Sequence, residues 1–307
     1  MVTTAPAPHA RLAVYTAVYP AARQYLAAWY RSVLDQTDPD FDLWVSLDGL
    51  DRTDVKRAVG EELVGEWLAA PASATIADVR QHALTELVKL YDAVVFVDAD
   101  DRLHPSRVAA ARAALKEHDV AACALRVIDG SGCPVGVTFG PSEAIAADAL
   151  LPQWNVFGLS NTAYRSAVLH DVLPIPTDAR LVDWLLATRA WASGAVLGFD
   201  REARMDYRQG DRNVARILPP FTAERVKGDT AMVLAHYEVL LGSAWPMPGW
   251  CADVITTARA RAHVFQDRIV SSDLRLAAYV DALNRLEPEY VWWWSVANRA
   301  LEAMWSN

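Results

Sequence analysis

Apolar residues along the chain follow two alternating patterns. Short continuous apolar runs predict strands buried on both faces, and apolar residues recurring every three to four positions predict amphipathic helices. The predicted strands are residues 11–19, 41–47, 93–97, 120–128 and 195–199. The predicted helices are residues 21–34, 54–68, 77–90, 105–118 and 181–191. This alternation predicts an α/β fold with a mainly parallel, Rossmann-like sheet flanked by helices.

The remaining segments follow neither pattern cleanly. Residues 1–10 form an Ala-, Pro- and Thr-rich stretch that we expect to be a flexible leader, and residues 130–155 have the composition of turns. Residues 201–216 are polar and rich in arginine. From about Pro219 the pattern becomes helical again, with breaks at Pro246, Pro248 and Pro288. The sequence therefore predicts a C-terminal helical extension, residues 216–307, after the sheet.

Carboxylates follow two of the predicted strands. Asp48 precedes Gly49 after the second strand, and Asp98, Asp100 and Asp101 come directly after the buried run of residues 93–97. In parallel sheets, ligands collect beyond the carboxyl ends of the strands. Clustered carboxylates repel one another unless a cation lies between them, and Mg²⁺ and Mn²⁺ prefer oxygen ligands. The alternative is a loop that only caps the next helix, since aspartate is common at such positions.

Composition and charge narrow the class of partner. Apolar residues make up 53% of the chain and charged residues 22%, a balance typical of globular proteins. The formal net charge of −9 disfavours nucleic acid, which requires concentrated Lys and Arg. Three scattered cysteines fit neither a disulfide framework nor a zinc site. With no signal-peptide pattern and no uninterrupted apolar run of about 18 residues, we expect a cytoplasmic protein; peripheral membrane contact stays open.

Several phrases occur in an order that resembles the family 2 glycosyltransferases. Residues 34–41 match a "Q-T-x-x-x-[FY]" phrase, and residues 45–49 match a strand that ends in Asp-Gly. A helix with an early Arg80 follows, and then the "D-A-D-D" phrase at residues 98–101. The resemblance covers roughly residues 11 to 215. It implies a GT-A fold with a nucleotide-binding half at 11–128 and an acceptor half at 129–215.

The family also implies roles for residues on the donor side. Asp48 would bind the nucleobase edge, with the first loop around Thr16 and Ala17 against the base. Arg80 would reach the nucleotide or its diphosphate, which suits a guanidinium group. Asp100 matches the principal metal ligand, with Asp98 nearer the ribose and the metal. The alternatives are a simple turn at Asp48 and a solvated helix residue at Arg80.

On the acceptor side, the resemblance points to Asp183 as the catalytic base. Family members begin a helix with an acidic pair, and here Val182 replaces the first acid. The alternative for Asp183 is an acid that only favours the helix dipole. Residues 207–213 resemble a "Y-R-x-H-x-x-[NS]" phrase, in which Arg208 and Arg212 are candidate phosphate contacts. The histidine of that phrase, a metal ligand in some members, is missing, which leaves a third protein ligand in doubt.

Tryptophans add two further expectations. Trp154 and Trp184 lie where a sugar face could stack, although buried packing is the commoner role of such residues. The cluster at residues 292–294, together with Trp305, is expected to be helix-packing core, with a dimer contact or an interfacial anchor as the alternative. Residues 155–164 occupy the usual place of the acceptor loop.

The resemblance thus implies an inverting, Mn²⁺- or Mg²⁺-dependent transfer from a nucleoside diphosphate sugar, with a UDP-sugar as the leading candidate. The acceptor would be a saccharide or another hydroxyl compound, and a homodimer stays open. One rival is a sugar nucleotidyltransferase, but residues 15–23 lack the glycines that its triphosphate loop requires. Another is a non-catalytic binding protein that keeps the fold. Motifs for serine hydrolases, zinc proteases and P-loop enzymes are absent from the sequence.

Overall fold

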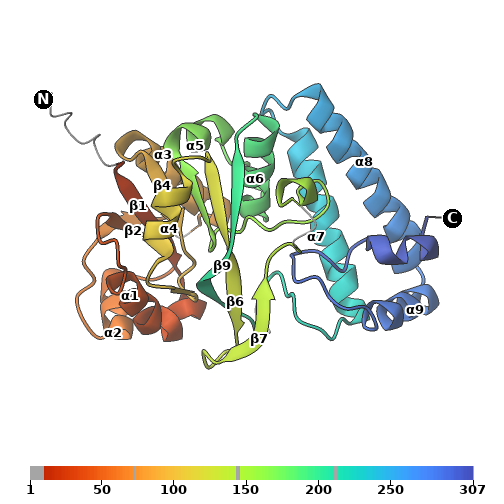
Figure 1. The fold of residues 1–307 in the computed structure, drawn as a ribbon, viewed down its shortest axis with the longest axis horizontal. Coiled ribbons are helices and arrows are strands. Elements are labelled where there is room, and N and C mark those ends of the chain that lie inside the picture. Colours follow the sequence, from red (N-terminus) through yellow and green to blue (C-terminus); the bar gives the residue numbers. More distant parts are fainter. Residues whose placement is uncertain (1–9, 72, 143–145, 211–212, 307) are drawn as a thin grey trace, which may run out of the picture.

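The computed structural model describes residues 10–71, 73–142, 146–210 and 213–306 (Figure 1). The strands are β1 Leu12–Val18, β2 Asp42–Leu47, β3 Glu66–Ala69, β4 Ala93–Phe96, β5 Arg102–Leu103, β6 Val120–Ile128, β7 Pro134–Phe139, β8 Thr162–Arg165 and β9 Leu197–Arg208. The α-helices are α1 Leu26–Leu34, α2 Arg52–Val59, α3 Ile76–Leu90, α4 Arg107–Ala114, α5 Ser166–Val172, α6 Val182–Ala192, α7 Ala223–Gly242, α8 Gly249–Phe265 and α9 Asp273–Leu283.

These strands form a single sheet in the order β3-β2-β1-β4-β8-β6-β9-β5, with β7 paired to β6. The first four run parallel, β8 is antiparallel to both β4 and β6, and β9 runs parallel to β6. Helices flank the sheet, which confirms the predicted α/β class (Figure 1). The carboxyl ends of β1, β2 and β4 meet at one edge, because β1 pairs in parallel with both neighbours.

The buried strands and the helix caps explain why these segments fold as they do. β4 is buried along its whole length and β1 at all but one residue, as continuous apolar runs in a parallel sheet require. Both α2 and α3 begin with a capping box, in which Asp51 pairs with Asp54 and Thr75 pairs with Asp78. The cap at Thr75 fixes the start of α3, and Arg80 therefore lies in the early part of this helix, as predicted.

Three predicted segments differ from the structure. The predicted helix 54–68 ends at Gly60, whose φ of 91° is left-handed, and Glu66–Ala69 is an edge strand. The turn region 130–155 contains β7, and the strand predicted at 195–199 continues to Arg208 because β9 pairs with β6 throughout. The Trp-rich residues 292–294 are buried, as expected, but lie in a non-helical segment.

The C-terminal helices pack together beside the sheet. α7 contacts α8 and α9, and the three form the right-hand part of the molecule in Figure 1. Rings join this layer to α6: Trp184 stacks on His236 at 4.3 Å between centroids and meets Tyr237 edge-on. The predicted C-terminal helical extension is therefore present and shares a core with the sheet-bearing part.

His236 makes the stability of this contact depend on pH. Burial lowers the pKa of His236 from 6.5 to about 3, and its Nε2 has no hydrogen-bond partner among the described residues. The unfolded chain takes up this proton below about pH 6.5, so the native state loses up to ~1.4 kcal/mol per pH unit as the pH falls. His236→Phe keeps a ring on Trp184 and should reduce the loss.

Thermal unfolding of both proteins between about pH 7 and pH 4 measures this effect. We expect the Tm of the variant to rise relative to that of the wild type as the pH falls. A constant Tm difference across the range would contradict the assignment.

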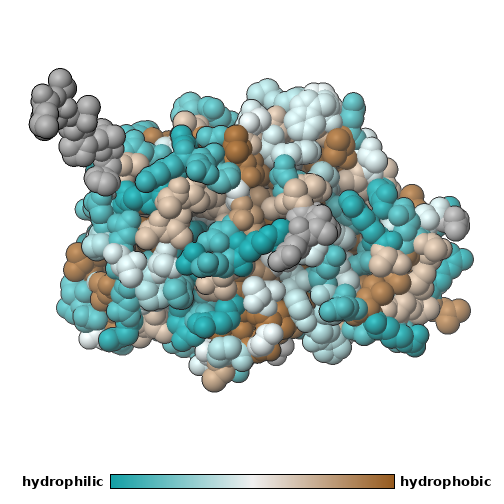
Figure 2. All heavy atoms as spheres, viewed as in Figure 1, coloured by the Kyte–Doolittle hydropathy of each residue, from teal (hydrophilic) through white to brown (hydrophobic). Residues whose placement is uncertain are grey.

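The exposed surface is mixed. Hydrophilic residues cover much of the face in Figure 2, and the apolar residues gather in small separate patches. Exposed large apolar side chains include Trp250, Val254 and Leu274 in the C-terminal helices. Among the described helices, none combines the length and apolar character needed to cross a membrane.

Candidate active site

A cleft of about 950 Å³ opens at the carboxyl edge of the sheet. Its lining comes from the segments after β1 and β4, the start of α3, the first turn of α6 and the end of β9. The predicted site residues that line it are Arg80, Asp98, Asp100, Asp183 and Arg208. The fold thus brings together residues that are distant in sequence, such as Asp100 and Arg208, which are 108 positions apart.

The acidic residues after β4 have different surroundings. Asp98 and Asp100 line the cleft, and the Asp98 side chain is 38% exposed. Asp101 is buried instead: it accepts hydrogen bonds from the Ser160 hydroxyl and, at 2.7 Å, from the Arg208 backbone N–H. Asp101 therefore holds the loop in place, while its two acidic neighbours face the ligand space.

Crowding of these carboxylates perturbs their ionisation. Desolvation within the recessed cleft raises the pKa of Asp98 to about 6, opposed by Arg80 and reinforced by Asp100 and Asp183. Burial also raises the pKa of Asp100, opposed by the Tyr19 hydroxyl and Arg208. Carboxylates held so close favour a bound cation, because a cation relieves both desolvation and mutual repulsion.

Arg80 lies among these acids. Its Nη2 is 3.6 Å from Asp98 Oδ1, and its side chain is only 15% exposed. Its charge lowers the pKa of both Asp98 and Asp183, against the larger effect of burial. A recessed guanidinium beside the cleft can bind a phosphate or carboxylate through paired hydrogen bonds.

Arg208 is tied to the protein rather than free. Its Nε donates to the Asp100 carbonyl at 2.9 Å, and Nη1 donates to the carbonyls of Asp129 and Gly130. Its guanidinium lies 4.1 Å from the centroid of the Tyr25 ring. Arg208 therefore fixes the acidic loop against the β6–β7 turn, and a phosphate contact from it stays a prediction.

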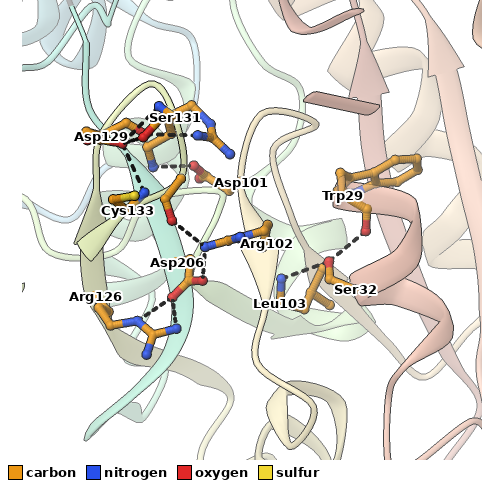
Figure 3. Close-up of polar contacts among 12 residues, drawn as sticks. Trp29, Ser32, Asp101, Arg102, Leu103, Arg126, Asp129, Ser131, Cys133 and Asp206 are labelled. Atoms are coloured by element: carbon orange, nitrogen blue, oxygen red, sulfur yellow. Dashed lines mark hydrogen bonds and ion pairs between the residues drawn. The ribbon is translucent and has the colours of Figure 1, made fainter. Parts of the chain in front are cut away.

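Figure 3 shows how that turn and its neighbours are held. Asp129 accepts hydrogen bonds from the backbone of Ser131 and Cys133, which closes the turn. The Asp206 carboxylate on β9 forms ion pairs with Arg102 and Arg126, with N···O distances of 2.8 and 2.6 Å. These ion pairs tie β5, β6 and β9 together beside the acidic loop.

Asp183 lies in the first turn of α6, as predicted. Burial raises the pKa of its carboxyl, opposed by N–H groups at the helix start, by Arg80 and by Asn155. Asn155 Nδ2 donates to Asp183 Oδ2 at 2.9 Å. A recessed carboxylate with an elevated pKa is suited to general-base chemistry.

The other predicted donor-side residues either do not line the cleft or lie outside the described chain. Thr16 and Ala17 are in β1, and Thr16 is buried with no partner for its hydroxyl among the described residues. Asp48 follows β2, where its N–H donates to the Val18 carbonyl at 2.9 Å. Thr16, Ala17 and Asp48 are not among the residues that line the cleft. Arg212 lies outside the described residues.

Sequence reasoning missed two tryptophans at this site. All four tryptophans are buried, but Trp292 and Trp293 line the cleft, whereas Trp154 and Trp184 do not. The expectation of helix-packing core overlooked that the chain returns to the cleft at Trp292 and Trp293. Their run of three consecutive tryptophans was the available signal.

The donor set fits a hard divalent cation. Asp98 and Asp100 supply carboxylate oxygens, which Mg²⁺ and Mn²⁺ prefer. Across the described ranges, no three His, Cys, Asp or Glu side chains are grouped to hold a metal unaided. Gln209 lies next to the position where the family phrase has its histidine. Its side chain donates to the Ala215 carbonyl and accepts from the Ile217 N–H. A cation here would therefore need oxygen ligands from a substrate as well.

Comparison with known proteins places the fold. No family model matches the chain, and no curated protein matches its sequence. The mannosyltransferase PcManGT from Pyrobaculum calidifontis, in complex with GDP-Man and Mn²⁺, is similar with a TM-score of 0.61 at 16% identity, over 98% of this chain and 81% of that one. TarS 1–349 of S. aureus with UDP-GlcNAc gives 0.55 at 16% identity, over 82% and 72%. The chain therefore has a glycosyltransferase, GT-A-like fold.

Proposed function

We propose that the protein is an inverting, metal-dependent glycosyltransferase that uses a nucleoside diphosphate sugar, with a UDP-sugar as the leading candidate. One observation carries the proposal: Asp98, Asp100, Arg80 and Asp183 line a single cleft. Cation-binding carboxylates, a diphosphate partner and a base are the groups that such a transfer needs. The fold shared with PcManGT and TarS supports the same class of reaction.

In this proposal Asp183 takes the proton of an acceptor hydroxyl. The oxygen attacks the anomeric carbon as the bond from that carbon to the diphosphate breaks, so one displacement inverts the configuration. Arg80 neutralises the leaving diphosphate. Asp98 and Asp100 would hold Mn²⁺ or Mg²⁺, which supplies charge stabilisation to that leaving group when bound.

Turnover tests the proposal against a non-catalytic binding protein. The protein is incubated with UDP-GlcNAc, UDP-glucose or GDP-mannose, Mn²⁺ and a panel of saccharide acceptors, and released nucleoside diphosphate is measured. We expect the protein to consume one of the donors, and we expect EDTA to abolish this consumption. Binding of a donor without any release would favour the non-catalytic alternative.

Arg80→Gln should weaken nucleoside diphosphate binding about tenfold, because a charged hydrogen-bond donor to phosphate is lost. Calorimetry with UDP and GDP measures the change. Arg31→Gln on α1, where the arginine is exposed, is the matched control and should bind like wild type. Equal affinities for wild type and Arg80→Gln would remove Arg80 from the diphosphate site.

A further inference from the structure

Asn155 connects the predicted base to a distant part of the chain. Its side chain is fully buried, and its Nδ2 donates to Asp183 Oδ2 at 2.9 Å. Its Oδ1 accepts from the Phe157 N–H at 2.9 Å, which fixes the orientation of the amide. Asn155 therefore presents a hydrogen-bond donor to Oδ2 of Asp183, and it does not contact Oδ1 of the same carboxylate.

The backbone of Asn155 is held by residues 290–298. Asn155 and Trp292 form an isolated antiparallel bridge, with N···O distances of 3.4 and 3.2 Å. The Trp292 indole also donates to the Tyr207 hydroxyl at 3.2 Å. This segment lies beyond the part of the sequence that resembles family 2 enzymes, yet it reaches the cleft.

Close packing and backbone strain show that residues 290–298 are held in one defined conformation. A Cβ on Gly158 would lie 2.3 Å from Trp292 Cη2, so the ring requires a glycine there. Within the described chain, the non-glycine residues with left-handed φ are Trp293 and Ala297, both in this segment. Such strain persists where surrounding structure enforces it, often at functional sites.

We propose that residues 290–298 belong to the catalytic site, and that Asn155, held by Trp292, is the positioning residue for Asp183. The inference rests on the proposed function for the role of Asp183 as base. Besides Asn155, the titratable groups that interact electrostatically with Asp183 include Arg80 from α3, Asp98 after β4 and Tyr164 from β8. Loss of the Asn155 donor removes a contact that favours the ionised carboxylate.

The test follows the Asp183 carboxyl by carbon-13 NMR in aspartate-labelled protein, assigned with Asp183→Asn. Asn155→Ala should raise the titration midpoint of Asp183 by about one pH unit. Asn155→Leu, which is of similar size and uncharged, should raise it too and serves if the alanine variant fails to fold. Gly158→Ala, which displaces Trp292, should raise it in the same direction.

Gln36→Ala is the matched control. Gln36 is also a buried amide, but it donates to the carbonyls of Ser32 and His104 and accepts from the Val108 N–H rather than contacting Asp183. Its variant should leave the midpoint unchanged. Equal shifts in the Asn155 and Gln36 variants, or no shift in either Asn155 variant, would overturn the positioning role. An unshifted Gly158→Ala protein would remove residues 290–298 from the site.

The titration needs neither donor nor acceptor, so its result is separate from the proposed function. Where turnover is measurable, Asn155→Ala should lower kcat and change the donor KM little. A protein that shows the midpoint shifts but consumes no donor would keep the positioning contact and lose the glycosyltransferase proposal.

Discussion

Asp183→Asn is expected to lower kcat by about 10²- to 10⁴-fold, the range that a positioned general base contributes. The asparagine keeps the shape of the side chain but cannot accept a proton from an acceptor hydroxyl. Donor binding should change by no more than about twofold, because Asp183 acts in proton transfer rather than in holding the nucleotide. Donor turnover and calorimetry measure the two effects separately.

Asp178→Asn is the matched control for this variant. Asp178 lies on the same cleft, five residues earlier, and the change removes the same charge. Its kcat should stay close to wild type. Equal losses in the two variants would indicate a general effect of charge and would contradict Asp183 as base.

Asp100→Asn should weaken metal-dependent nucleotide binding by about a hundredfold, because an amide is a poorer ligand than a carboxylate for Mn²⁺ or Mg²⁺. Asp100 lines the cleft together with Asp98, where such a cation would lie. Binding measured without the metal should change little. Calorimetry with UDP or GDP, with and without Mn²⁺, gives both values.

Asp101→Asn, in the same D-A-D-D phrase at residues 98–101, is the comparison for Asp100→Asn. Asp101 is buried against Ser160 and the Arg208 backbone, so its variant should lower stability and weaken metal-dependent binding much less than Asp100→Asn does. If Asp101→Asn removes the metal effect and Asp100→Asn does not, the ligand assignment is wrong.

The sequence predicted the parallel half of the sheet because its strands are continuous apolar runs. It also correctly placed Asp98 and Asp100 at the carboxyl edge of the sheet, since parallel strands bring their carboxyl ends together. The sequence did not predict β3 and β7. β3 is short and β7 is mostly exposed, so neither strand has a strong apolar pattern. Their pairing depends on neighbours distant in sequence.

Contacts across the chain explain what was missed at the site. Arg208 has the character of a free cation in sequence, but three carbonyls and Tyr25 surround its guanidinium. The bond between Asn155 and Asp183 and the return of Trp292 to the cleft depend on packing between distant segments. Local pattern carries no information about such contacts.

Calorimetric titration of UDP, GDP and dTDP into the wild-type protein, with and without Mn²⁺, tests the central claim most directly. The account predicts that one nucleoside diphosphate binds and that Mn²⁺ strengthens its binding. Absence of binding by all three to a demonstrably folded protein would contradict a nucleotide-sugar site in this cleft.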